Sequence, residues 1–329
     1  MTSVLITGCA GAVGQGIIAG LSNANANLRL IGSETDPYAA PFYLKDSKLE
    51  KVFRTTYVNS PEYVPELIEI CRKEEVDIVF PGTDVELPKL AAGKEIFADY
   101  GAKVIVSPFE TVEICRDKWL TFMHLGKTIP IVKSAIVEPD LHKALNTTGF
   151  PAVLKPRVGW GSRVVYKVGN IEEAMILARN VNNPVIQTWL EGKEYTVDCL
   201  ADKRGRIVCS VPRLRLKIFS GLSFEGVTVK NPRLIELGSA IAENLEFYGP
   251  FNFQAKLING EPVVFEINPR FSGGGILTIR AGANIPLLAV QEACGCRSSA
   301  KVGFDEGVFF SRFFHEVIFR NSEVDITDA

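Results

Sequence analysis

The stretch NGEPVVFEINPRFSGG, residues 259–274, determines how the rest of the chain is interpreted. Its apolar run ends in Glu266-Ile267-Asn268, and Pro269 and Arg270 follow. Residues two apart in a strand point to the same face, so Glu266 and Asn268 are predicted to project together. A carboxylate beside a carboxamide suits Mg²⁺, which proteins hold through one or two oxygens together with nucleotide phosphates. Arg270 adds a guanidinium that can contact a phosphoryl group through two hydrogen bonds. Taken alone, the pattern also fits an ordinary strand that ends in a solvated charged turn.

A second strand is predicted just before this stretch, over residues 251–256, where apolar residues alternate with Asn252 and Gln254. Asn259-Gly260 separates the two strands, and this dipeptide is a strong signal for a β-hairpin. Pairing of the strands is expected to bring Gln254 near Glu266. The hairpin therefore predicts a third oxygen ligand for the metal.

Composition limits the class of protein. The chain has 329 residues, 47% of them hydrophobic, and a formal net charge of −2. This length allows two or three domains, and the balanced charge predicts no nucleic-acid or membrane surface. The seven cysteines are scattered and odd in number, and no signal-peptide or membrane-spanning pattern opens the chain. We therefore expect a cytoplasmic protein with reduced thiols, in which Cys294-Gly295-Cys296 is too closely spaced for a zinc site.

The first hundred residues alternate between short apolar runs and amphipathic segments. We predict strands at residues 4–7, 28–32, 77–80 and 103–106, and helices at residues 15–21, 61–75 and 87–100. Strands separated by helices indicate a parallel sheet with helices on both faces. This part of the chain is therefore expected to be a Rossmann-like unit.

Two loops of this unit lie where parallel sheets bind ligands, at the carboxyl ends of their strands. Residues 8–14 place glycines in a G-x-x-G-x-x-G pattern before a helix, and residues 33–36 carry acids after the second strand. The pair allows NAD(P) binding, but the spacing differs from G-x-G-x-x-G, and a structural role is favoured. Residues 81–84 follow the third of these strands. They could contact a bound substrate, or Thr83 or Asp84 could cap the next helix.

A second α/β region follows. A helix is predicted over residues 109–125, and strands over residues 152–156 and 164–168 with a basic glycine-rich loop between them. Backbone amides of such a loop can bind polyphosphate, although the same pattern also fits a plain hairpin. Asn170 and Glu173 then form a capping-box arrangement at the start of a helix.

The strands after this helix carry further polar candidates. A turn at Gln187-Thr188-Trp189-Leu190 can present backbone groups to adenine, and Glu194 can accept hydrogen bonds from ribose or stand as an exposed glutamate. The strand predicted over residues 208–218 places Arg213, Arg215 and Lys217 on one face. Three aligned cations fit a solvated edge, or a receptor for an anionic substrate or a leaving phosphate.

In their order and spacing these segments resemble an ATP-grasp enzyme of the carbamoyl-phosphate-synthase large-chain type, with a Rossmann-like pre-ATP-grasp unit before it. The resemblance reaches to about Gly295 and is most specific in VVFEINPRFSGG. It implies ATP and Mg²⁺ or Mn²⁺ as cofactors, with metal ligands Gln254, Glu266 and Asn268. It further implies phosphate contacts from Lys118, Lys155, Gly159, Gly161 and Ser162, an adenine hinge at Gln187, Thr188, Trp189 and Leu190, and ribose binding by Glu194. The resemblance implies catalytic roles for Arg270 and Lys155. It implies one for Arg213 as well, although the motif around Arg213 matches less closely.

The resemblance also implies a division of the chain and a reaction class. The pre-ATP-grasp domain would span residues 1–107, the two-subdomain α+β ATP-grasp domain residues 108–295 (with parts 115–187 and 188–295), and a C-terminal extension residues 296–329. The chain has room for one ATP-grasp unit and carries no glutaminase signature. We therefore expect a free-standing ligase that joins a small carboxylate to an amine or ammonia through an acylphosphate. Nucleic acid and membrane are not expected partners, and a homodimer is left open.

Two other classes of function remain at this stage. An NAD(P)- or nucleotide-sugar-dependent oxidoreductase could be built on the first eighty residues, but no Tyr-x-x-x-Lys pair follows. A non-catalytic nucleotide-binding regulator would keep the fold without turnover. The presence of Lys155, Glu266 and Asn268 argues against the regulator.

Overall fold

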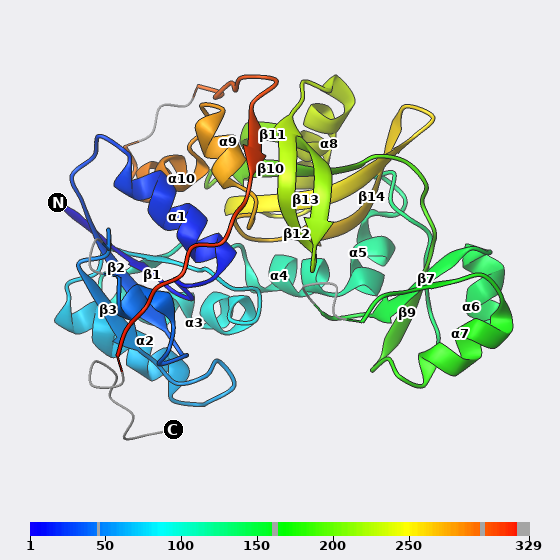
Figure 1. Cartoon of the computed structure of the whole chain (residues 1–329), viewed down its shortest axis with the longest axis horizontal. Helices are drawn as coiled ribbons and strands as arrows, with labels where there is room; N and C mark the ends of the chain where they lie inside the picture. Colours follow the sequence, from blue (N-terminus) through cyan, green and yellow to red (C-terminus); the bar gives the residue numbers. More distant parts are fainter. Residues whose placement is uncertain (45–46, 160–163, 297–299, 321–329) are drawn as a thin grey trace.

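The computed structural model describes residues 1–44, 47–159, 164–296 and 300–320, and within these ranges it contains three β-sheets. Figure 1 shows the N-terminal sheet at one end of the long axis and the sheet of residues 134–188 at the other, with a six-stranded sheet between them. This arrangement confirms the predicted fold class, a Rossmann-like unit followed by two further units of mixed α and β structure.

The N-terminal sheet is parallel throughout, as predicted. Its strands are β1 (Thr2–Ile6), β2 (Leu28–Glu34), β3 (Lys51–Arg54), β4 (Ile78–Phe80) and β5 (Lys103–Val104), in the order β3-β2-β1-β4-β5. Helices α1 (Ala12–Ser22), α2 (Tyr63–Lys73) and α3 (Leu87–Asp99), with the short 3-10 turn η1 (Ala40–Phe42), connect them. The last four residues of β1 are fully buried, as expected for a strand covered on both faces. Strand β3 was not predicted, because two of its four residues are charged.

The second sheet has four strands in the order β6-β9-β7-β8. These are β6 (Ser134–Ile136), β7 (Ala152–Pro156), β8 (Tyr166–Val168) and β9 (Pro184–Thr188), and helices α6 (Leu141–Thr148) and α7 (Ile171–Ala178) belong to the same unit. The predicted helix start is confirmed, since Asn170 Oδ1 accepts a hydrogen bond from the Glu173 backbone N–H (2.9 Å). The Glu173 carboxylate in turn accepts from the N–H of Gly169 (2.8 Å).

The third sheet is antiparallel, in the order β14-β13-β10-β11-β12-β15. Its strands are β10 (Glu194–Ala201), β11 (Ile207–Phe219), β12 (Leu222–Thr228), β13 (Gly249–Ile258), β14 (Glu261–Asn268) and β15 (Phe309–Ser311). Helix α8 (Pro232–Asn244) packs its apolar side, which includes Leu234, Leu237 and Ile241, into the core of this sheet. The site residues predicted from the opening stretch lie at the β14 edge of this sheet.

The single helix predicted over residues 109–125 is wrong. The structure has α4 (Phe109–Arg116) and α5 (Lys118–Leu125), and Asp117 between them has an extended backbone. Its carboxylate caps α5 by accepting from the N–H groups of Trp119 and Leu120. It also pairs with Arg157, which is 40 residues away in sequence. The helix is interrupted because Asp117 serves these two partners at once.

The N-terminal unit and the third sheet share a hydrophobic core. Residues of β1 and α1 pack in one cluster with Val208, Cys209 and Val211 of β11 and with the inner face of α10 (Ile285–Ala293). Helix α10 follows the short α9 (Ile276–Arg280) and lies beside α1 (Figure 1). The Asn284 side chain at the start of α10 donates to the Gly20 carbonyl of α1 at 2.8 Å. The two units are therefore held in a fixed relation by apolar packing.

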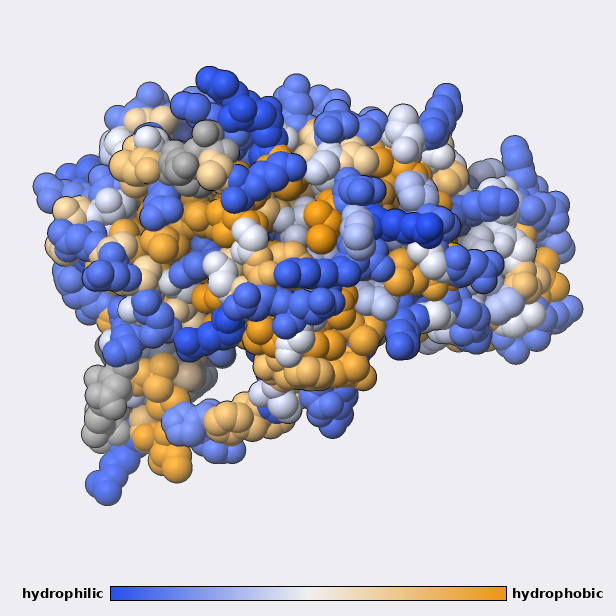
Figure 2. Space-filling view, turned by 90° about the horizontal axis from the view of Figure 1, so that it is seen from above, coloured by the Kyte–Doolittle hydropathy of each residue, from blue (hydrophilic) through white to orange (hydrophobic). Residues whose placement is uncertain are grey.

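The predicted C-terminal extension contributes to the third sheet. Strand β15 pairs with β12, and the chain then runs back across the molecule to the N-terminal unit, where Phe319 stacks on Tyr43 at 3.8 Å between ring centroids (Figure 1). Phe309, Phe313, Phe314 and Ile318 of this segment are 70–94% exposed. Figure 2, seen from above, shows hydrophobic side chains open to solvent among hydrophilic ones. No helix in the described part of the chain is long and apolar enough to cross a membrane.

Candidate active site

The hairpin of β13 and β14 forms as predicted. Asn259 and Gly260 both have positive φ (53° and 85°), and the register pairs Gln254 with Glu266 and Asn252 with Asn268. Glu266 is half-buried and Asn268 is 9% exposed. Asn268 uses its side-chain nitrogen to contact Asn252 Oδ1 (3.4 Å), which directs its own oxygen elsewhere. The pairing therefore brings the three predicted metal ligands to one edge of the sheet.

Arg270 ties this edge to the N-terminal unit. Its Nε and Nη2 donate to the two carboxylate oxygens of Asp84 at 2.8 and 2.9 Å. The predicted capping of α3 by Thr83 or Asp84 is wrong, because the N-cap position is Glu86. The buried Glu86 carboxylate accepts from the backbone N–H groups of Gly82 and Thr83 and from the Thr83 hydroxyl. Asp84 is left to pair with the guanidinium at the metal-ligand loop.

Two lysines lie near this edge, one on a strand of the second sheet and one at the start of α5. Lys155, on β7, is 7% exposed, and its Nζ lies 5.9 Å from the ring centroid of Phe265 on β14. Burial, together with the nearby charge of Lys118, lowers the pKa of Lys155 to about 7, although Glu266 and Glu194 oppose the shift. Lys118, the first residue of α5, donates from Nζ to the carbonyl of Gly159 at 3.2 Å. Both predicted phosphate-binding lysines thus lie near the predicted metal ligands.

A narrow cavity of about 30 Å³ lies among these groups. Asp84, Val85, Lys118, Gly159, Glu266 and Asn268 are among the residues that line it, so it joins all three units of the fold. The predicted loop residues Gly161 and Ser162 lie outside the described residues. A larger hollow of about 860 Å³ is lined by residues 203–207 and the end of α8, and by none of the predicted site residues.

The predicted adenine hinge is well anchored. Gln187, 3% exposed, donates from Nε2 to Ser134 Oγ at 2.9 Å, and Thr188 Oγ1 donates to the Thr148 carbonyl at 2.8 Å. The Trp189 ring has Lys167 Nζ at 4.1 Å and Lys256 Nζ at 5.0 Å from its centroid. Lys256 also donates to the Leu190 carbonyl at 3.0 Å. These contacts fix the backbone at this turn, while a contact with adenine stays a prediction.

The predicted row of three cations is divided by an irregularity in β11. Arg213 and Arg215 are 1% and 9% exposed, so the solvated-edge interpretation is wrong for both. The register shifts between Arg215 and Lys217, and the Lys217 side chain is 65% exposed, 3.8 Å from Glu225. Both arginines therefore pair with an acid at the sheet, whereas the Lys217 side chain lies in solvent.

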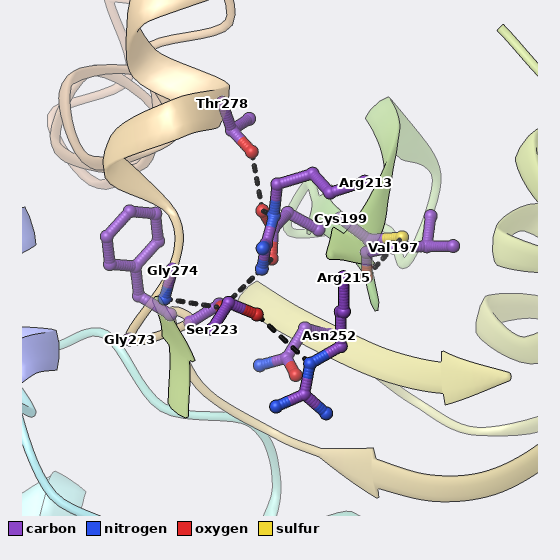
Figure 3. Close-up of polar contacts among 12 residues, drawn as sticks. Val197, Cys199, Arg213, Arg215, Ser223, Asn252, Gly273, Gly274 and Thr278 are labelled. Atoms are coloured by element: carbon purple, nitrogen blue, oxygen red, sulfur yellow. Dashed lines mark hydrogen bonds and ion pairs between the residues drawn. The ribbon is translucent and has the colours of Figure 1, made fainter. Parts of the chain in front are cut away.

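Arg213 lies in a closed network, shown in Figure 3 with Thr278 and Gly274 beside it. It donates from Nε and Nη2 to the two oxygens of Asp198 (2.6 and 3.1 Å), and from Nη2 to Ser272 Oγ (2.8 Å). A Cβ on Gly274 would lie 2.6 Å from Arg213 Nη1, so only glycine fits there. Nη1 has no hydrogen-bond partner among the described residues. The predicted substrate contact of Arg213 is not tested by these contacts, which hold the Ser272–Gly274 turn.

Arg215 connects the predicted ribose and metal residues. Its Nη1 pairs with Glu194 and donates to Gln254 Oε1 (3.2 Å), and its other nitrogens bind Ser223 Oγ and the Gly221 carbonyl. Burial lowers the pKa of Arg215, and the Glu194 carboxylate opposes this shift. Glu194 is therefore not the exposed strand-start glutamate that its sequence also allowed.

Two family models match the chain at these units. Residues 180–312 match the model described as "ATP-grasp in the biosynthetic pathway with Ter operon", and residues 4–105 match the "PylC-like, N-terminal domain". The chain contains an ATP-grasp domain. This confirms the resemblance drawn from the sequence.

Relatives and solved structures agree with the ATP-grasp assignment. The carbamoyl phosphate synthase large chain of Caldanaerobacter subterraneus subsp. tengcongensis is 24% identical over 272 residues, 76% of this chain and 25% of that protein. The chain thus spans about a quarter of the length of this relative. Biotin carboxylase from Campylobacter jejuni, in a β-γ-ATP complex, has a TM-score of 0.76 and 17% identity, covering 92% of this chain and 73% of that one. L-amino acid ligase from Bacillus licheniformis has a TM-score of 0.66 and 18% identity, covering 89% and 74%. At these identities the structural likeness shows the fold.

The donor set of the ATP-grasp domain fits Mg²⁺ with a nucleotide. No group of three or more His, Cys, Asp or Glu that could hold a metal lies within the described residues. The predicted set of Gln254, Glu266 and Asn268 supplies one carboxylate and two amides, which is too little charge for a metal held by protein alone. Mg²⁺ completes such a set with phosphate oxygens and water. Phosphate binding by Lys118 and Lys155 stays a prediction.

Three ion pairs between an acid and an arginine were not predicted from the sequence. Asp84 pairs with Arg270, Asp117 with Arg157, and Asp198 with Arg213. The sequence could have indicated a buried ion pair at Asp198, because Asp198 is the one charged residue inside the apolar run 195–201. Its partner was not apparent, since it lies on the neighbouring strand in a register that only the folded sheet defines.

Proposed function

We propose that this protein is an ATP-dependent ligase that joins a small-molecule carboxylate to an amine or ammonia through an acylphosphate, with release of ADP. The observation that carries the proposal is that Lys118 lines the same narrow cavity as Glu266 and Asn268, with the buried Lys155 close enough to Glu266 for the two charges to interact. The match of residues 180–312 to an ATP-grasp model supports it. A site of cations and oxygen ligands without a nucleophile suits phosphoryl transfer, where positioning and charge neutralisation provide the rate.

Each predicted site residue has a part in this proposal. Gln254, Glu266 and Asn268 would hold Mg²⁺, which would supply positive charge to neutralise the phosphates. Lys118 and Lys155 contact the phosphates, Gly159, Gly161 and Ser162 cover them, Gln187, Thr188, Trp189 and Leu190 form the adenine hinge, and Glu194 binds ribose. Arg270 faces the transferred phosphoryl group, and Arg213 contacts substrate or supports the turn beside it.

The chain's own groups explain the order of events. Lys155 has its pKa lowered to about 7 by burial, so the arrival of polyphosphate favours its charged form. The substrate carboxylate then attacks the γ-phosphorus and ADP leaves. The neutral amine then attacks the acyl carbon and phosphate leaves. The proton that the nitrogen loses passes to the departing phosphate, and an amide remains. Water would hydrolyse the acylphosphate, so the site is expected to close over it during the reaction.

The proposal is tested by measuring ADP and phosphate release in a panel of carboxylates crossed with amines, in the presence of Mg-ATP. Glu266→Gln removes the charge that balances Mg²⁺ and is expected to abolish turnover without unfolding the protein. Glu261→Gln is the matched control, because Glu261 lies on the same strand, is exposed and pairs with Arg233. Full turnover in a folded Glu266→Gln protein would overturn the ligase assignment.

A further inference from the structure

A second recess lies in the N-terminal unit, next to the candidate active site. It has a volume of about 420 Å³ and lies at the carboxyl ends of strands β1, β2, β3 and β4, where Gly8, Glu34, Thr55 and Thr83 line it. Val85 lines both this recess and the narrow cavity that contains Glu266 and Asn268. A ligand in the recess would therefore lie directly beside the predicted site of phosphoryl transfer.

The polar groups of the recess select the charge of a ligand. Glu34 is the one carboxylate among its lining residues, and no lysine, arginine or histidine of the described chain lines it. The remaining walls are hydroxyl, amide, aromatic and apolar groups, which include Tyr57, Tyr63, Asn59 and Val85. Such a lining favours a cation with an apolar body over an anion, because a carboxylate and aromatic faces both attract an ammonium group.

The Glu34 carboxylate is held in place and keeps capacity to bind. Its Oε2 accepts from the Ala10 backbone N–H (3.1 Å) and its Oε1 from the Thr35 N–H (2.8 Å). The Thr35 hydroxyl adds a longer contact to Oε1 (3.4 Å). An ionised carboxylate offers about four acceptor positions, so these three bonds orient it without saturating it. The neighbouring walls are equally fixed, because Tyr63 and Thr83 both donate to the buried Glu86 carboxylate.

The glycine turn argues against a dinucleotide in this recess. A Cβ on Gly8, whose φ is +52°, would lie 2.4 Å from Thr83 Cγ2, so the Thr83 side chain covers the face that phosphates would need to approach. A Cβ on Gly14 would likewise lie only 2.6 Å from the Gly8 carbonyl oxygen, so the helix packs too closely there for a side chain. The glycines are therefore explained by packing of the chain against itself.

We propose that this recess, with Glu34 at its centre, binds a small organic amine in its ammonium form and is the site for the amine substrate. The role as substrate site rests on the proposed ligase function, whereas the binding itself does not. The amine would lie at the carboxyl edge of the parallel sheet, next to Val85, which also lines the cavity that contains Glu266 and Asn268. This assigns the N-terminal unit to acceptor recognition and the ATP-grasp domain to activation of the acid.

Binding is tested by saturation-transfer NMR with phenethylamine and with phenethyl alcohol, which has a similar shape and no charge. The wild-type protein is expected to bind the amine and not the alcohol. Glu34→Gln should weaken amine binding at least about tenfold, as loss of a charged partner predicts. Asp36→Asn is the matched control, an exposed acid two residues away that does not line the recess. Asn59→Trp, at an exposed lining position, should block the recess without disturbing Glu34.

Several results would overturn the proposal. Equal binding of amine and alcohol, or unchanged amine binding in both folded Glu34→Gln and Asn59→Trp proteins, excludes the recess as an ammonium site. NADH binding that is lost in Glu34→Gln would assign the recess to a dinucleotide instead. If the substrate panel shows turnover, Glu34→Gln should raise KM for the amine about tenfold and leave KM for ATP unchanged. Turnover with an unchanged KM for the amine in Glu34→Gln would refute the recess as the amine site and leave the ligase function standing. Amine binding at the recess without any turnover would leave the binding site standing and count against the ligase function.

Discussion

Replacing Asp198 by asparagine removes the carboxylate that neutralises Arg213 inside the third sheet. The two side chains are 2% and 1% exposed, and the pair is reinforced by Thr278 on Asp198 and by Ser272 on Arg213. Removing one member of a fully buried ion pair costs about 3–5 kcal/mol, because the other charge stays buried without its partner. Asparagine keeps the size of the side chain, so the loss reports charge and hydrogen bonding and not an empty cavity.

The expected loss is a large share of the total stability, which for folded proteins is about 5–15 kcal/mol. At about 2–4 °C per kcal/mol, the melting temperature of Asp198→Asn should fall by about 6–20 °C. Thermal unfolding followed by circular dichroism measures the change. Asp202→Asn is the matched control, because Asp202 is equally buried but its partner Arg206 is 59% exposed and can be solvated when unpaired. Its melting temperature should fall much less.

A double replacement separates charge from packing. Asp198→Leu with Arg213→Met removes both charges and fills similar space, so it should recover most of the lost stability, since apolar groups often replace buried pairs at little cost. A melting temperature for Asp198→Asn within about 2 °C of wild type, or no lower than that of Asp202→Asn, would refute this reasoning. Turnover measured on the double variant then tests Arg213 directly. Wild-type activity would show that Arg213 does not contact substrate.

Four further outcomes are expected for residues of the active site. Burial lowers the pKa of Lys155 to about 7, so its protonated fraction falls above that pH. Mg-ATP affinity, measured by calorimetry, should therefore weaken from pH 7 to pH 9 in the wild-type protein. In Lys155→Arg the affinity should depend less on pH. The same depressed pKa means that the unfolded chain binds more protons between about pH 7 and 10.5, so stability should rise with pH over that window and the rise should be smaller in Lys155→Met. Asn268→Asp adds charge to a hard-cation site, so activity should fall less than in Glu266→Gln and the ratio of Mn²⁺- to Mg²⁺-supported turnover should change; an unchanged ratio contradicts metal ligation by Asn268. Asp84→Asn weakens the bidentate contact with Arg270, which is 15% exposed, so turnover should fall while ATP affinity stays, and equal losses of both would place Arg270 in the nucleotide site.

The sequence by itself determined the features that depend on neighbouring residues. The hairpin at Asn259-Gly260 and the resulting pairing of Gln254 with Glu266 follow from turn chemistry and the two-residue period of a strand. The parallel N-terminal sheet follows from the alternation of apolar strands and helices, and the start of α7 from the Asn170 cap. Each of these signals acts over a few residues, so the local pattern contains the physical cause.

The tertiary structure decided which charges meet. Asp117 interrupts a helix because Arg157 reaches it from the loop after β7, and Arg270 finds Asp84 across 186 residues of sequence. The row of cations on β11 is divided by a register shift that leaves Arg213 buried against Asp198 and Lys217 in solvent. The sequence alone does not show whether a charged residue in a strand is solvated or paired. Only the packing of one unit on another removes the water and supplies the partner, and that packing depends on contacts between residues far apart in the chain.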